Sequence, residues 1–101
     1  MIVVRFKMRC QTDKVDRAVA VLNDVIGPSR ALPGVLSFDI GRDLSDADCL
    51  IATEVFEDPA ALDTQESLPQ VRAVLALLPE VLAAPPEATR YHVSLAEPHG
   101  T

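Results

Sequence analysis

Apolar and polar side chains alternate in four stretches of the chain, and this period of two is typical of half-buried β-strands. The predicted strands cover residues 2–9, 35–43, 49–57 and 88–96. In the last of them, Tyr91 lies on one face and His92 on the other. A short turn rich in Asp and Ser separates the second and third stretches, which favours an antiparallel hairpin.

A first helix is predicted after the first strand, because apolar residues recur there at steps of three and four over residues 15–26. Thr12 or Asp13 is a candidate N-cap for this helix. The Gly27-Pro28 pair is expected to end or bend it, since proline lacks the N–H that a helix interior needs.

Two further helices are predicted between the third strand and the last. A short one covers residues 59–66, with Pro59 at the first helical position, where proline is tolerated. The other carries an apolar stripe over residues 68–82, with Ser67 as its candidate cap. Pro79 falls inside this stripe and is expected to kink or interrupt it.

The order of elements is β-α-β-β-α-β, with the second helical segment broken in two, which predicts an α+β, ferredoxin-like antiparallel sheet with helices on one face. Residues 1–101 are long enough for one domain. The other face of the sheet carries Val3, Ile51 and Val55, and no predicted element remains to cover them. We therefore expect a homodimer whose two sheets pack face to face.

Charge and composition exclude several classes of function. The chain has 15 acidic and 9 basic residues and a net charge of −6, and the basic residues are dispersed, so nucleic acid is not an expected partner. No apolar run is long enough to span a membrane, and the charged N-terminal segment does not read as a signal peptide, which favours a cytoplasmic protein. Cys10 and Cys49 are expected to be free thiols, without the spacing of a metal site.

The run from Ser29 to Ser67 resembles the antibiotic biosynthesis monooxygenase (ABM) domain family. The resemblance rests on a small residue and Arg before PGVLSFDIGRD, on the motif Glu-x-aromatic-Glu-Asp from Glu54 to Asp58, and on a helix that opens with PAAL. It implies a dimeric α/β barrel. It also implies oxygenation of quinols or polyketide-type aromatics without metal or flavin, although some members degrade haem or process small signalling molecules.

Several positions depart from the family pattern. Phe56 stands where many members have Trp, and Gln65 and Gln70 stand where many have His. At the positions that match the haem-degrading branch, the chain has Phe6, Gln65 and Leu75, which offer no axial ligand for iron. Haem degradation is therefore not expected, and because the resemblance implies neither metal nor flavin, no cofactor is expected.

Three residues are candidates for catalysis: Glu54, His92 and Gln65. Glu54 shares its strand face with apolar residues, a setting that raises the pKa of a carboxyl group and suits a general base. The alternative is a structural carboxylate paired with Arg5 or Arg90, or one at a dimer seam. His92 is a candidate base or hydrogen-bond partner, or else a strand histidine on a polar or dimer-facing side. Gln65 would orient a ligand, or else simply face solvent.

Candidate substrate-binding residues complete the expected pocket, and they are Phe6, Phe38, Phe56, Tyr91 and Gln70. The aromatic side chains suit a small hydrophobic or aromatic molecule, although strand aromatics are also ordinary core residues. These features favour a cofactor-independent monooxygenase. A non-catalytic dimeric binding module and a proton-transfer isomerase or cyclase remain as alternatives, because one fold hosts many functions.

Overall fold

The computed structural model describes residues 1–100 and has an α+β fold with four strands and three helices. The elements run β1 (Ile2–Arg9), α1 (Val15–Arg30), β2 (Val35–Asp43), β3 (Asp46–Phe56), α2 (Pro59–Glu66), α3 (Pro69–Val81) and β4 (Glu87–His92). All strand pairs are antiparallel, in the order β2-β3-β1-β4. The ferredoxin-like fold class is thus confirmed. None of the helices within residues 1–100 has the length and apolar content that a membrane crossing requires.

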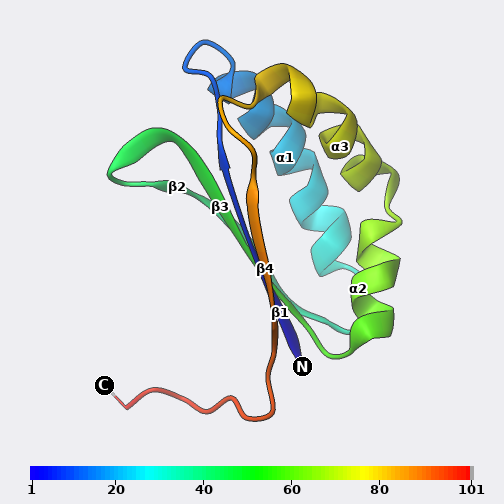
Figure 1. The fold of residues 1–101 in the computed structure, drawn as a ribbon. Helices are drawn as coiled ribbons and strands as arrows, with labels where there is room; N and C mark the ends of the chain where they lie inside the picture. The colour runs from blue at the N-terminus through cyan, green and yellow to red at the C-terminus, as the bar shows by residue number, and fades with distance from the viewer. Residues whose placement is uncertain (101) are drawn as a thin grey trace.

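The three helices lie on one side of the sheet, and its other side is left open (Figure 1). Helix α1 packs against β2 and α3, while α2 contacts α3, β2 and β3. The open face carries alternate residues of the two central strands and of β4, namely Val3, Arg5, Lys7, Ile51, Thr53, Val55 and Tyr91. The uncovered apolar side chains predicted on this face are therefore confirmed.

Neither proline inside a helix ends or interrupts it, although an end or interruption was one of the two outcomes expected for each. Helix α1 continues through Pro28 to Arg30, and α3 contains Pro79 and ends at Val81. Each proline lies in the last turn of its helix, where a lost N–H and a displaced carbonyl disturb few hydrogen bonds.

The predicted helix caps are wrong: the N-cap of α1 is Lys14 and not Thr12 or Asp13, and the N-cap of α3 is Leu68 and not Ser67. The Thr12 hydroxyl donates to Asp48 at 2.6 Å, and α1 begins after Lys14 without a side-chain cap. The Ser67 hydroxyl donates to the Asp63 carbonyl at 2.8 Å at the end of α2. Two strand boundaries also moved: β3 begins earlier, at Asp46, and β4 ends at His92.

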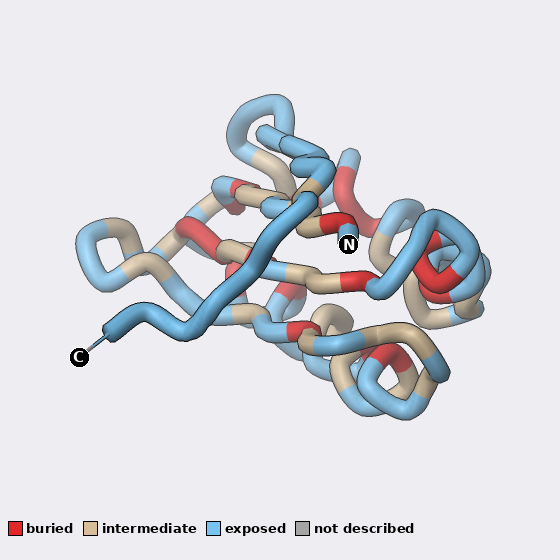
Figure 2. The backbone as a smooth tube through the Cα atoms, turned by 90° about the horizontal axis from the view of Figure 1, so that it is seen from below, coloured by how far each residue is buried: buried red, intermediate tan, exposed pale blue. Residues whose placement is uncertain are grey.

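The buried apolar residues form two separate clusters between the helices and the sheet. The larger one gathers Met8, Cys10, Val15, Ala18, Leu50, Leu77, Leu78 and Val81. The smaller one gathers Ile2, Phe56, Ala61 and Leu62. Figure 2 shows that buried segments occupy the helices and central strands, while β4 and the C-terminal tail are exposed. Along β3, Glu54 stands between Leu50 of the larger cluster and Phe56 of the smaller one, on the same face of the sheet.

Candidate functional site

Glu54 lies two residues before the end of β3, on the helix-facing side of the sheet, between Leu50 of the larger cluster and Phe56 of the smaller one. Its cross-strand neighbours are Val4 on β1 and Phe38 on β2. The prediction that it shares a face with Leu50 and other apolar β3 residues is confirmed, because strand alternation places every second residue on one side. As a whole residue, Glu54 is half-buried.

The Glu54 carboxyl group is desolvated and lacks a cationic partner. Burial is the main cause that raises its pKa from 4.5 to about 7, and the nearby Glu66 carboxylate adds to the effect. The ion pairs found within residues 1–100 do not include Glu54, so the alternative of a structural pair with Arg5 is not realised. Arg5 lies on the opposite face of the sheet. A carboxyl group with these properties exchanges protons near neutral pH.

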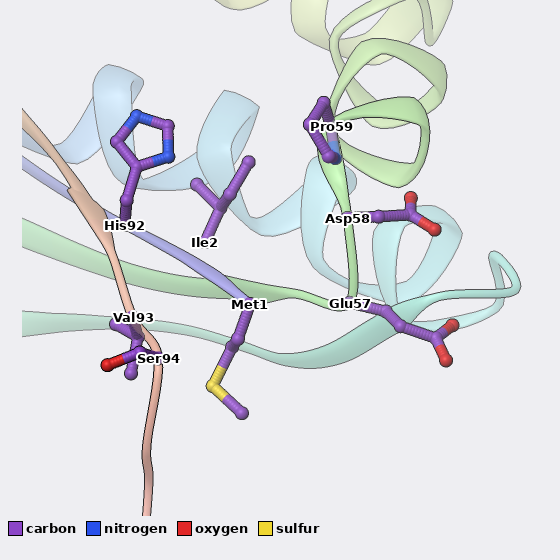
Figure 3. Close-up of a pocket in the computed structure, with 8 residues that line it drawn as sticks. All are labelled: Met1, Ile2, Glu57, Asp58, Pro59, His92, Val93 and Ser94. Atoms are coloured by element: carbon purple, nitrogen blue, oxygen red, sulfur yellow. The ribbon is translucent and has the colours of Figure 1, made fainter.

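His92 lies at one end of the sheet, away from Glu54. Its backbone pairs with Ile2, and this register puts His92 on the helix-facing side. A cavity of about 360 Å³ opens beside it, lined by Met1, Ile2, Glu57, Asp58, Pro59, His92, Val93 and Ser94. In Figure 3 the His92 ring and the Ile2 side chain point to one side, and Met1 points to the other. Glu54 does not line this cavity, so the structure does not bring these two candidates together.

Gln65 is buried and holds two helices together. Its Nε2 atom donates a hydrogen bond to the Ser29 hydroxyl at 3.1 Å, and both residues are almost inaccessible to solvent. Gln65 therefore does not face solvent, and its amide already has a partner within the protein. Ser29 was not a candidate in the sequence. The helical spacing could have indicated that Ser29 is buried, because Ser29 follows Val25 by four residues and so continues the buried stripe of α1 beyond Pro28.

Gln70 offers an unused hydrogen-bond acceptor. It lies in the first turn of α3 and is half-buried, and its Oε1 atom is shielded from solvent without a hydrogen-bond partner among residues 1–100. A buried acceptor without a donor costs about 1–3 kcal/mol. A ligand hydroxyl or N–H group would satisfy it.

The candidate aromatic residues divide between the two sides of the sheet. Phe38 and Phe56 are buried on the helix-facing side, and Phe6 packs at the edge of the larger cluster. Tyr91 pairs with Val3 on the open face and is 49% exposed. The expectation that all four aromatic side chains line one cavity is therefore wrong within the protomer. The register of β4 places Tyr91 beside Val3 on the open face, whereas the three phenylalanines lie on the helix-facing side.

Similarity to known proteins shows the family to which the chain belongs. A family model described as antibiotic biosynthesis monooxygenase (ABM) matches residues 1–77. The chain belongs to the ABM family. A curated relative of this ABM protein, the uncharacterized protein sll1783 of Synechocystis, is 29% identical over 93 residues. The match covers 92% of the chain but only 63% of that relative.

Solved structures share the fold of this ABM protein. Rv0793 from Mycobacterium tuberculosis aligns with a TM-score of 0.86 and 25% identity, covering 95% of this chain and 96% of that one. A candidate antibiotic biosynthesis monooxygenase from Deinococcus radiodurans aligns with a TM-score of 0.88 and 19% identity, covering the whole of both chains. At 19% identity, the similarity to the Deinococcus radiodurans structure shows a shared fold and nothing more.

The two cysteines of this ABM protein do not form a reactive centre. Cys10 and Cys49 are buried free thiols, and burial is the main cause that raises the pKa of each. A raised pKa disfavours the nucleophilic thiolate. Within residues 1–100, no group of three or more His, Cys, Asp or Glu side chains is arranged to hold a metal ion.

Proposed function

We propose that this ABM protein is a cofactor-independent monooxygenase of a small aromatic, quinol-like or polyketide-type substrate, with Glu54 as the general base. The observation that carries the proposal is the Glu54 carboxyl group, which is desolvated, unpaired and poised at a pKa of about 7 between apolar clusters. A base is most effective when its pKa lies near the working pH, because it is then both available and strong enough to take a proton.

In the proposed reaction, Glu54 removes a proton from an activated methylene group or a phenolic hydroxyl of the substrate. The resulting carbanion or phenolate is electron-rich and reduces dioxygen. For a methylene group, the carbon becomes a carbonyl carbon, one oxygen atom enters that carbonyl and the other leaves as water. For a hydroquinone, a ring C–H bond is replaced by a C–O bond, the ring is oxidised to a hydroxyquinone, and the second oxygen atom leaves as water. The four electrons that dioxygen accepts come from the substrate, so the reaction needs no external reductant.

The neighbouring side chains have supporting roles in this proposal. Phe38 lies beside Glu54 on β2 and supplies apolar contact for an aromatic ring. The unpartnered Gln70 Oε1 accepts a hydrogen bond from a substrate hydroxyl. His92, in the cavity at the end of the sheet, serves as a hydrogen-bond partner for a more extended substrate.

The proposal includes a homodimer in a reducing, cytoplasmic setting. The open face of the sheet carries half-buried Val3 and Val55 beside the exposed Tyr91, and packing on a second copy would remove these apolar groups from water. The unpaired, buried Cys10 and Cys49 fit a compartment that keeps thiols reduced.

Oxygen uptake by the metal-free protein with a panel of anthrones and hydroquinones tests the proposal. We expect uptake above the rate without protein, and a loss of at least tenfold in Glu54→Gln, which keeps the shape but cannot accept the proton. The control is Glu97→Gln, the same change in the exposed tail. Thermal stabilisation by these compounds without turnover would contradict the proposal and favour a binding module. Substrate proton exchange without oxygen uptake would contradict it in favour of an isomerase.

A further inference from the structure

Helix α2 is fixed at both of its ends. At its start, the Asp58 side chain accepts a hydrogen bond from the Ala61 N–H at 2.9 Å. Gly34, with φ of +82°, lies so close that an added Cβ atom would stand 2.7 Å from the Ala61 Cβ atom. The first turn of α2 therefore packs tightly against the chain that leads into β2.

The last turn of α2 is held by the hydrogen bond between Gln65 and Ser29. Ser29 belongs to the final turn of α1, and its neighbour Arg30 is anchored to β2. The Arg30 guanidinium group donates to the Phe38 carbonyl at 2.9 Å and pairs with Asp39 at 3.0 Å. The residue next to Ser29 is thus hydrogen-bonded to β2, the strand that flanks Glu54.

Glu66 follows Gln65 directly at the end of α2. Its negative charge is the second cause, after burial, that raises the pKa of Glu54. The side chains beside Glu54 on β1 and β2, Val4 and Phe38, are apolar. On the same face of the sheet, β4 contributes Arg90 and His92, both exposed.

The remaining helices bring no partner for the Glu54 carboxyl group. Arg30 of α1 is engaged with Asp39, and Arg72 of α3 is exposed and forms no ion pair within residues 1–100. Helix α2 packs against β3, the strand that carries Glu54, so the position of its last turn sets how close the Glu66 carboxylate comes to Glu54.

We propose that Ser29 and Gln65 are a positioning pair: their buried hydrogen bond holds the last turn of α2 so that Glu66 stays close to the Glu54 side chain. This inference rests on the proposed role of Glu54 as the base. It assigns Gln65 to tuning that base through the fold, without contact with substrate. Loosening the pair lets Glu66 move away and admits water, and both changes ease ionisation of Glu54.

The test is a ¹³C NMR titration of the Glu54 carboxyl carbon in the substrate-free protein. The double variant Ser29→Ala with Gln65→Met removes both polar groups while nearly keeping their volumes, which leaves no orphaned donor and favours a folded protein. We expect the titration midpoint of Glu54 to fall by about half a pH unit in this variant. Glu66→Gln, at an exposed position, is expected to lower the midpoint as well.

The matched control is Thr64→Val, which removes a 2.9 Å hydrogen bond within α2 that does not reach α1. We expect this variant to leave the Glu54 midpoint unchanged. A midpoint equal to that of the wild type in the double variant, alongside a lowered midpoint in Glu66→Gln, would overturn the inference. Because the titration uses no substrate, this result is separate from a failure of the oxygen-uptake experiment.

Discussion

Glu54 and Arg90 lie on the same face of the sheet in one cross-strand row, with Val4 of β1 between them, and they form no ion pair. Two strand spacings separate their backbones by about 10 Å. The carboxyl group is therefore left to its apolar surroundings and to the like charge of Glu66, which explains why its pKa rises. This unpaired carboxyl group is the basis of the predictions below.

Glu54 makes the stability of the protein depend on pH. Its pKa is raised from 4.5 to about 7 by folding, so the folded state binds the proton more tightly than the unfolded state. The stabilisation from this group is fully present below pH 4.5 and is lost as the pH rises through about 7. Partial exposure limits the effect to about 1–2 kcal/mol.

Urea denaturation at pH 4.5 and pH 8 measures this effect in the wild type and in Glu54→Gln, which stays neutral throughout. We expect the wild type to lose about 1–2 kcal/mol more than the variant between the two pH values. Equal pH dependence in the two proteins would show that folding does not perturb this carboxyl group.

Gln70→Leu is expected to stabilise the free protein by up to about 1 kcal/mol, because the change removes a shielded acceptor that has no donor. The same change is expected to weaken binding of hydroxylated aromatic ligands.

Gln11→Leu is the control. The Gln11 amide donates to the Glu80 and Leu82 carbonyls, and loss of these hydrogen bonds is expected to destabilise the protein. Denaturation midpoints and ligand titrations check both effects, and a destabilised Gln70→Leu would mean that its amide is satisfied.

The alternation of apolar and polar residues predicted which residues of one strand share a face. It did not predict which face of one strand lies on the same side of the sheet as a given face of the next strand. Period two placed Glu54 with Leu50 correctly, because that relation depends on a single strand. The side on which Tyr91 lies depends on the register between β4 and β1, and a shift of one residue reverses it. The sequence therefore grouped Tyr91 with aromatic residues that lie across the sheet.

The link between Gln65 and Ser29 was not predictable for a similar reason. It joins residues 36 positions apart, and it depends on α1 continuing past Pro28, where local rules favour an end. The short helix with Pro59 at its start was predicted correctly, because its signals are local. Contacts between segments that are far apart in the sequence depend on how helices and strands pack, and a local sequence pattern does not determine that packing.

A negative charge on the open face is expected to prevent the proposed homodimer. In Val55→Asp, the charge would lie opposite apolar groups of a second copy and would lose its hydration there. Leu75→Asp is the control, because Leu75 lies on α3, is 58% exposed and is remote from this face. Sedimentation velocity is expected to show a dimer for the wild type and for Leu75→Asp, and a monomer for Val55→Asp. A monomeric wild type at tens of micromolar would contradict the assembly.

The protonation of Glu54 in the folded protein is the central claim, and the ¹³C chemical shift of its carboxyl carbon measures it directly as a function of pH. The structure predicts a titration midpoint of about 7. A midpoint near 4.5, the ordinary value for this side chain, would mean that Glu54 is a fully ionised carboxylate at neutral pH, and it would remove the observation on which the proposed monooxygenase rests.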